Sequence, residues 1–416
     1  MARQVALQRL LLHAAILATL APEVSCGGGR ALLGSGTDIL PVYNQYWSVA
    51  ATDLNGDGKL DIAVSYSIMS GSPPHAGVVA VYLQDPSKPG SFLGPVTYSV
   101  GNDPVALTVG DLNGDGKPDI VTANTIMNAD GKGSSSVSVL LQDPANPGHF
   151  LPAESFATGF SPVQVAVGDL NGDGLTDIAV ADTNGVSILL QSTSARGQFL
   201  PLKTLAIGSG GTSAIAIADL DGDGRAELLV TTATGVNVYS QDPASPGTFL
   251  TPTSYSAGAQ PCFILVRDLN GDGLPDLAVA NLGSADGSTP ASLSVLLQNP
   301  ISPGTFLSAT NYSSGLRSEG VAAADLDGDG RVDLVVANMG GYEGGSVYIF
   351  LQSTAVAGTY QPGVKYAYAG PAMLAVGDLN GDGKPDLVVA GIDLEIWFQD
   401  PAHPGTFLTP TILASS

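Results

Sequence analysis

A nine-residue motif, D-L-[ND]-G-D-G-x-x-[DE], recurs seven times along this 416-residue chain and constrains its fold more than any other feature. The copies are 49 to 58 residues apart and begin at Asp53, Asp111, Asp169, Asp219, Asp268, Asp325 and Asp378. Each copy carries oxygen-bearing side chains at its first, third, fifth and ninth positions, with glycine at the fourth and sixth, where the backbone must curl tightly. Calcium takes about six to eight oxygen ligands, and a tightly wound loop turns alternate side chains inward. The motif therefore predicts seven calcium-binding loops.

The seventh position of the motif varies freely, so we expect only its backbone carbonyl to reach the ion. An EF-hand would end with Glu at the twelfth position, where the first copy has Val64, so Asp at the ninth position is expected to close the loop. The predicted calcium positions are Asp53, Asn55, Asp57, Lys59, Asp61; Asp111, Asn113, Asp115, Lys117, Asp119; Asp169, Asn171, Asp173, Leu175, Asp177; Asp219, Asp221, Asp223, Arg225, Glu227; Asp268, Asn270, Asp272, Leu274, Asp276; Asp325, Asp327, Asp329, Arg331, Asp333; and Asp378, Asn380, Asp382, Lys384, Asp386.

The net charge of the chain supports a shared purpose for these carboxylates. Five copies contribute three acidic residues each and two copies contribute four, which makes 23, and the chain as a whole carries a formal charge of −23. Arg225 and Arg331 stand at the seventh position of the two copies with four carboxylates, which indicates local charge compensation. The scarcity of basic residues, 15 Lys and Arg in all, argues against nucleic acid as a partner because no basic stripe is available to contact phosphates.

The spacing between the copies predicts four short strands per repeat. In the third copy, residues 162–167 form one predicted strand, residues 177–181 a second and residues 186–190 a third, while Phe199 opens a fourth after a turn. Each turn begins with Gln, as at Gln84, and the aromatic residue that ends it is expected to pack between blades. Four strands per period of about 50 residues are typical of a β-propeller blade, so we predict an all-β, seven-bladed propeller with four-stranded antiparallel blades.

The motifs and their spacing resemble the FG-GAP or VCBS-type repeats of the integrin α-subunit propeller, over residues 43–413. The resemblance implies a seven-bladed ring with calcium in the loop between the first and second strands of each blade, and ligands on the opposite face. Up to seven calcium ions are implied, one per blade. Residues 32–42 and 407–413 both read as a fourth strand, which leaves open which end of the chain closes the ring.

The first 26 residues read as an export signal, because two arginines precede an apolar run over residues 10–21 that is too short to span a bilayer. Val24-Ser25-Cys26-Gly27 resembles a bacterial lipid-attachment site at Cys26, although Glu23 departs from that pattern, and ordinary cleavage near Cys26 is the alternative. Residues 27–37 then form a flexible tether and residues 38–416 the propeller. We expect a secreted or cell-envelope monomer, with a membrane contact only through such an anchor. The other cysteine, Cys262, is expected to be a small core residue.

Seven nearly identical loops are better explained as structural fastenings than as a reaction centre. The connection between the second and third strands breaks the symmetry: it is predicted to be short in the third, fourth and seventh blades and long in the first, second, fifth and sixth. By alternation of strand direction, these connections lie opposite the calcium loops, and long loops on a rigid scaffold often carry binding sites. The predicted ligand-face residues are Tyr66, His75, Asn128, Asp130, Lys132, Asp286, Arg317, Tyr342 and Glu343.

The favoured function is recognition or adhesion, with an unknown protein or glycan as the ligand and calcium in a structural role. A polysaccharide lyase or other hydrolytic enzyme is the alternative, with His75 acting beside Tyr342 or Arg317, but no nucleophile–base pairing or zinc spacing is visible. His149 and His403 are expected in turns on the calcium-loop side. A purely structural envelope protein is the third hypothesis, in which the long loops are merely tolerated insertions.

Overall fold

The computed structural model describes residues 44–68, 75–125, 135–183, 185–207, 213–284, 289–341, 344–368 and 373–414. The predicted signal peptide, Cys26 and the tether lie outside these ranges. The described residues contain strands, turns and bends but no helix. Accordingly, no described helix is long and apolar enough to cross a membrane.

Seven four-stranded antiparallel sheets follow one another along the chain, and each sheet is one blade. Blade 1 comprises β1 (Asn44–Thr52), β2 (Asp61–Ile68), β3 (Ala76–Tyr82) and β4 (Val96–Val100). Blade 2 comprises β5 (Pro104–Gly110), β6 (Asp119–Asn124), β7 (Ser136–Leu140) and β8 (Glu154–Ala157). Blade 3 comprises β9 (Gln164–Gly168), β10 (Asp177–Asp182), β11 (Gly185–Leu189) and β14 (Lys203–Leu205), with the small hairpin β12 (Gln191–Ser192) and β13 (Ala195–Phe199) before its last strand.

The remaining four blades repeat the same order. Blade 4 comprises β15 (Ile215–Ala218), β16 (Glu227–Thr231), β17 (Gly235–Tyr239) and β18 (Thr253–Ser256). Blade 5 comprises β19 (Pro261–Arg267), β20 (Asp276–Asn281), β21 (Ser292–Leu296) and β22 (Thr310–Ser313). Blade 6 comprises β23 (Ser318–Ala324), β24 (Asp333–Gly341), β25 (Gly344–Phe350) and β26 (Val364–Tyr368). Blade 7 comprises β27 (Met373–Gly377), β28 (Asp386–Ala390), β29 (Leu394–Trp397) and β30 (Thr411–Ala414).

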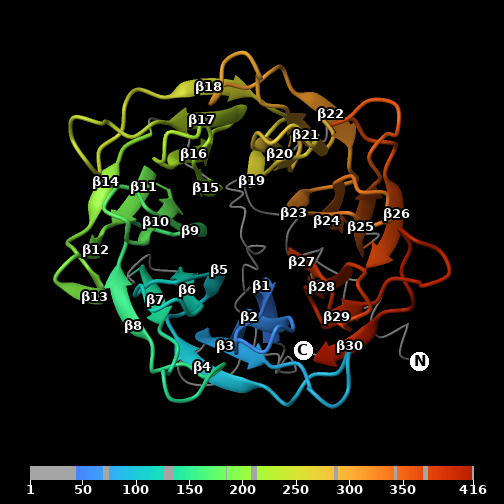
Figure 1. Ribbon diagram of the computed structural model, residues 1–416, viewed down its shortest axis with the longest axis horizontal. Helices are drawn as coiled ribbons and strands as arrows, with labels where there is room; N and C mark the ends of the chain where they lie inside the picture. Colours follow the sequence, from blue (N-terminus) through green and yellow to red (C-terminus); the bar gives the residue numbers. More distant parts are fainter. Residues whose placement is uncertain are drawn as a thin grey trace, which may run out of the picture.

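The blades stand side by side in a ring, with the first strand of each blade nearest the centre and the fourth at the rim (Figure 1). The hydrophobic core lies between blades, as seven clusters that each join two neighbours. The cluster between blades 1 and 2, for example, packs Leu54 and Val79 against Ile120 and Phe150. The turn aromatics enter this packing: the Phe150 and Tyr98 rings meet edge to face, 5.6 Å apart. The structure thus confirms the predicted seven-bladed propeller.

The ring is closed by packing between complete blades. β30 pairs with β29, so the chain's C-terminal segment supplies the fourth strand of blade 7, and this strand lies beside blade 1 (Figure 1). Tyr46 and Ile62 of blade 1 share a core cluster with Val388 and Ile396 of blade 7. Among the described residues, the C-terminal end therefore completes the last blade; residues 32–42, the other candidate, lie outside the described ranges.

Strand direction alternates within each blade and so defines two faces. The motif copies join the first and second strands and, with the turns between third and fourth strands, form one face, which we call the metal-loop face. Connections between second and third strands, and between blades, form the opposite face. His149 and His403 lie in turns on the metal-loop face, as predicted.

Candidate metal-binding loops and the opposite face

Each motif copy, here called a metal loop, is wound by its own side chains. In the first loop, residues 53–61, the Asp53 carboxylate accepts hydrogen bonds from the backbone N–H groups of Gly56 (2.7 Å) and Gly58 (2.8 Å). Gly56 and Gly58 have φ angles of 78° and 83°, which L side chains rarely adopt. The same two glycine positions have positive φ in all seven loops, which confirms the predicted tight curl.

Short hydrogen bonds turn the alternate side chains inward. Asn55 Oδ1 accepts from the N–H of Asp57 (2.8 Å), and Asp57 Oδ1 accepts from the N–H of Lys59 (2.9 Å). Corresponding bonds recur in the second and seventh loops at 2.8 and 2.9 Å. These turns present oxygen atoms from alternate side chains toward the inside of the loop, and oxygen atoms are the ligands that a hard cation requires.

The ninth position of the loop is a buried anchor. Asp61 is fully buried, and its two oxygens accept hydrogen bonds from the N–H groups of Leu54 (2.9 Å) and Gln84 (2.8 Å). Burial raises the pKa of this carboxyl to about 6, although the two backbone donors oppose the rise. Burial likewise raises the pKa to about 6 in Asp119, Asp276, Asp333 and Asp386, and to about 7 in Asp177 and Glu227.

In the fourth and sixth loops, where the third position is aspartate, three carboxylates converge. One carboxylate oxygen from each of Asp219, Asp221 and Glu227 lies within 4.8 Å of the others, and Asp325, Asp327 and Asp333 meet the same limit. Two oxygens that both lie about 2.3–2.6 Å from a calcium ion can be no more than about 5 Å apart. These acidic clusters can therefore bind a metal ion without a large rearrangement.

Side chains at the seventh position follow three patterns. Lys59, Lys117 and Lys384 turn away and donate to carbonyl groups of the nearby Asp-Pro turns, those of Pro86, Pro144 and Pro401, at 3.1, 3.3 and 3.2 Å. Leu175 is buried in its loop. Arg225 and Arg331 form ion pairs with Asp223 (3.0 Å) and Asp329 (2.7 Å), which confirms the predicted local compensation.

The glutamine that opens each turn has a role that the sequence interpretation missed. The Gln352 side-chain amide donates to the carbonyl oxygens of Val332 in its own blade and Leu269 of blade 5, both at 2.7 Å. Gln84 makes the corresponding bond to Leu379 of blade 7 (2.7 Å) and so ties the two ends of the ring together. The sequence contained a signal for this role, because Gln stands at the start of the turn between the third and fourth strands in every repeat: Gln84, Gln142, Gln191, Gln241, Gln298, Gln352 and Gln399.

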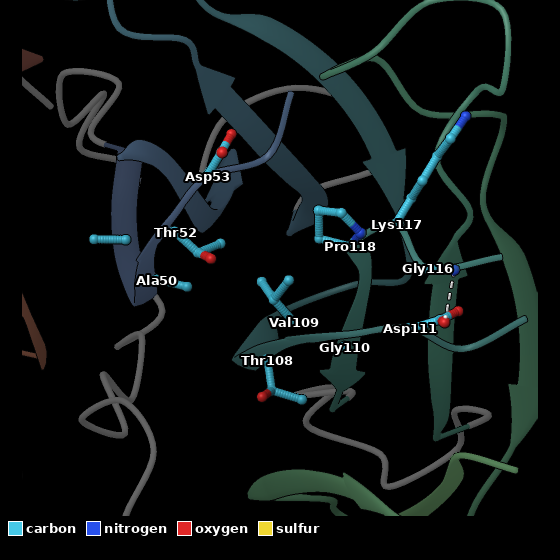
Figure 2. A pocket seen from close by; sticks show the side chains of 11 residues that line it. Ala50, Thr52, Asp53, Thr108, Val109, Gly110, Asp111, Gly116, Lys117 and Pro118 are labelled. Carbon is cyan, nitrogen blue, oxygen red and sulfur yellow. Dashed lines mark hydrogen bonds between the residues drawn. The ribbon is translucent and has the colours of Figure 1, made fainter. Parts of the chain in front are cut away.

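A shallow hollow of about 540 Å³ opens between the first two metal loops. Figure 2 shows its walls, which come from the ends of β1 and β5 and include Asp53, Asp111 and Lys117. The sequence could not predict it, because the hollow is formed by two blades set side by side in the ring. It lies on the metal-loop face, away from the predicted ligand face.

The opposite face differs from the prediction in two places. Tyr66, expected in a long connection, lies in β2 and packs its ring 5.7 Å from that of Tyr46. The predicted long connection of blade 6 is instead an extended hairpin, because β24 continues to Gly341 and pairs there with Gly344. Extending the strands satisfies more backbone hydrogen bonds than a free loop would. Between the second and third strands that the structure describes, long connections follow β2, β6 and β20. Six predicted ligand-face residues lie outside the described ranges: Asn128, Asp130, Lys132, Asp286, Tyr342 and Glu343.

His75 and Arg317 lie on the opposite face, as predicted, but on different blades. His75 precedes β3, and its Nδ1 donates to Asp103 Oδ1 at 3.0 Å. Asp103 is 1% exposed and also accepts from Ser67 (2.8 Å), while its Oδ2 has no hydrogen-bond partner. Arg317 immediately precedes β23, near the buried Glu319, whose pKa is raised by burial to about 7. The structure therefore pairs His75 with Asp103, a residue that the sequence interpretation did not single out.

Cys262 is buried at the start of β19, and its thiol donates to the Ser318 carbonyl oxygen at 3.0 Å. The prediction of a small core residue is confirmed.

The seven blades, each with an acidic loop between its first two strands, define a repeat β-propeller. The FG-GAP-like repeat family matches residues 68–122, 169–230, 219–279, 268–336 and 325–389, and the FG-GAP repeat family matches residues 46–82. These matches cover more than half of the sequence. The chain therefore belongs to the FG-GAP repeat family, as the motifs predicted.

Solved structures share the fold at low sequence identity. A putative 6-phosphogluconolactonase from Bacteroides uniformis gives a TM-score of 0.60 at 13% identity, covering 91% of this chain and 98% of that chain. A lectin from Agrocybe aegerita, described as specifically recognising non-reducing terminal N-acetylglucosamine, gives 0.52 at 19% identity, covering 88% and 94%. No curated protein matched the sequence. At these identities the likeness establishes the fold alone.

Proposed function

We propose that this protein is an extracytoplasmic recognition module in which calcium fastens one face of the propeller and a protein or glycan ligand binds the other. The observation that carries the calcium assignment is the convergence of three carboxylate oxygens within 4.8 Å in both the fourth and the sixth metal loops. The buried ninth carboxyl adds to this assignment, because a cation would stabilise its ionised form.

Calcium is favoured over magnesium by the donor set. Carboxylate, amide and backbone oxygens in a flexible loop suit an ion that accepts six to eight ligands, whereas magnesium requires a stricter octahedron and retains more water. The first, third, fifth and ninth side chains would hold the ion, with the seventh-position carbonyl. When bound, calcium would supply charge neutralisation and cross-linking of the loop, with no role in a reaction.

A melting experiment tests the calcium proposal. Adding calcium to the metal-stripped protein should raise the melting temperature, because a ligand that binds only the folded state stabilises it by about 2.7 kcal/mol per site at one hundred times Kd. Magnesium at the same concentration is the control and should give a smaller rise. Equal melting temperatures with calcium and with EGTA would contradict the proposal.

The recognition role is supported by where the repeats differ. Blades 3, 4 and 7 join their second and third strands through short connections, whereas those after β2, β6 and β20 are long. This variation lies on the face opposite the metal loops. FG-GAP repeats are typical of extracellular proteins, in agreement with the export signal inferred from residues 1–26.

Ligand screening tests the recognition role. Glycans are the first class to examine because a lectin shares this fold. A glycan array and a pull-down should be run with the wild type and with a variant whose connection between β6 and β7 is shortened to the length found between β10 and β11. We expect the variant to keep its melting temperature and lose binding. Unchanged binding by variants with each long connection shortened would favour the structural-protein hypothesis.

A further inference from the structure

Arg225 and Arg331 occupy the seventh position of the fourth and sixth metal loops, and each engages both oxygens of the fifth-position aspartate. Asp329 Oδ1 accepts from the Arg331 backbone N–H at 2.9 Å, while Oδ2 accepts from Arg331 Nη2 at 2.7 Å. In the fourth loop, the Asp223 oxygens accept from the Arg225 N–H at 2.8 Å and from Nη1 at 3.0 Å. Each arginine thus forms a hydrogen-bonded ring with the aspartate two residues before it.

The other five loops serve as internal comparisons, since none contains this closure. Their fifth-position aspartates accept the same backbone bond at 2.9 Å, as Asp57 does from Lys59. The lysine ammonium groups, however, point to turn carbonyls instead, and two loops have leucine. Within the described part of the chain, only the fourth and sixth loops join the fifth and seventh side chains by an ion pair.

The same two loops also carry the extra carboxylate. Their third position is Asp221 or Asp327, where the other five loops have asparagine. Four carboxylates in one tight turn repel one another, and one guanidinium reduces the net charge of the loop to −3, the value of the third and fifth loops, which have three carboxylates and leucine at the seventh position. The first, third and ninth carboxylates remain, and these are the groups that converge within 4.8 Å.

We propose that Arg225 and Arg331 are built-in counter-ions, which keep the fourth and sixth metal loops ordered without metal and hold their calcium affinity below that of an unpaired four-carboxylate loop. The inference rests on the calcium role proposed above. The proposal divides the seven loops into two classes. In two loops an arginine partly neutralises the carboxylates, and in the other five the carboxylates depend on the metal ion for this. Arg331 contributes more, because its ion pair is shorter and its side chain less exposed, 34% against 45% for Arg225.

The test replaces each arginine with leucine, the residue that the third and fifth loops carry at this position. In metal-free protein, Arg331→Leu should increase hydrogen exchange over residues 325–333, since four carboxylates then repel without compensation. With calcium, removing one positive charge beside the ion should tighten that loop's affinity about three- to tenfold. Lys59→Leu is the matched control and should leave exchange over residues 53–61 nearly unchanged.

Isothermal titration with calcium and exchange mass spectrometry provide separate readouts on the full chain. The proposal is overturned if Arg331→Leu leaves both the exchange and the affinity of the loop unchanged, or weakens calcium binding. Arg331→Lys, which keeps the charge but loses the paired geometry, should give an intermediate exchange rate and guards against a folding defect. A wild type that shows neither heat nor any change in hydrogen exchange on addition of calcium would refute the calcium role itself, whereas the metal-free exchange comparison would still decide the role of the arginine.

Discussion

At the scale of single residues, the ninth carboxyl of each metal loop is buried where a charge is costly. Asp61 accepts two backbone hydrogen bonds, yet burial still raises its pKa from 3.8 to about 6. Six further loops show a rise to about 6 or 7. A metal-free propeller must therefore either protonate these groups or keep negative charge in its interior.

The raised pKa values of these buried carboxyl groups set the sign of the pH dependence of stability in the metal-free protein. Between the unfolded value of 3.8 and the folded value of about 6, the folded protein binds more protons than the unfolded chain, so its stability should fall as pH rises through this window. The melting temperature of metal-stripped protein should be several degrees lower at about pH 7.5 than at about pH 5.

Saturating calcium provides the control, because the ion replaces the protons and the slope should flatten or reverse. Asp177→Asn, which removes a carboxyl with a pKa of about 7, should also flatten it. A metal-free melting temperature that rises with pH over the same range would contradict the argument.

The His75–Asp103 pair makes a second prediction at this scale. Asp103→Ala should lower the free energy of unfolding by about 1–3 kcal/mol, because Ser67 and His75 each lose a buried acceptor. In the connection after blade 2, the backbone N–H of Ser161 donates to Ser135 Oγ at 3.1 Å, so the chain is joined there without an ionisable pair. The double change His75→Ser and Asp103→Ser should therefore cost less than Asp103→Ala in urea unfolding. A larger cost for the double change would show that this site requires the ionisable pair.

At the scale of elements, the turn is joined to the preceding blade by a glutamine side chain in five of the seven blades, through Gln84, Gln142, Gln241, Gln352 and Gln399. Gln352 and Gln298 make the same two bonds within their own blades. The side-chain NH₂ group of Gln352 donates to the Val332 carbonyl, and that of Gln298 to the Pro275 carbonyl. The side-chain oxygen accepts from the backbone N–H of Gly358 in one case and of Gly304 in the other. Only Gln352 also reaches the Leu269 carbonyl in the neighbouring blade. The two residues therefore form a natural comparison for the inter-blade bond.

Gln352→Ala should destabilise the protein by about 1–2 kcal/mol more than Gln298→Ala, because it leaves one additional buried carbonyl without a donor. Chemical denaturation of both variants at fixed calcium measures the difference. Equal losses would indicate that the bond between blades contributes nothing net beyond the bonds within them.

The sequence predicted those elements whose causes are local. Gly56 and Gly58 stand where φ must be positive, and Asp53 and Asp57 bond only to their near neighbours, so one motif was enough to predict the loop. The extended hairpin of blade 6 could not be predicted, because Gly341 and Gly344 read equally well as a flexible loop. Contacts between residues distant in sequence, such as Gln84 with Leu379, depend on the closed ring.

At the scale of the whole molecule, closure of the ring depends on packing between complete four-stranded blades. Each blade buries apolar side chains against both neighbours, and the cluster between blades 7 and 1 joins the two ends of the described chain. Blade 7 takes all four of its strands from one continuous segment, and among the strands that the structure describes β30 pairs only with β29. Its Leu413 and Ala414 pack against the closing cluster.

Deleting residues 411–416 should therefore weaken the closure and lower the melting temperature by several degrees, because β29 loses its outer partner and the closing cluster loses part of its cover. Deleting residues 27–37, the predicted tether, is the matched control and should leave the melting temperature unchanged. Calorimetry of both truncated chains at saturating calcium makes the comparison. If the N-terminal deletion is the more damaging, residues before β1 share in closing the ring, which is the arrangement that the strand-like sequence at residues 32–42 also allows.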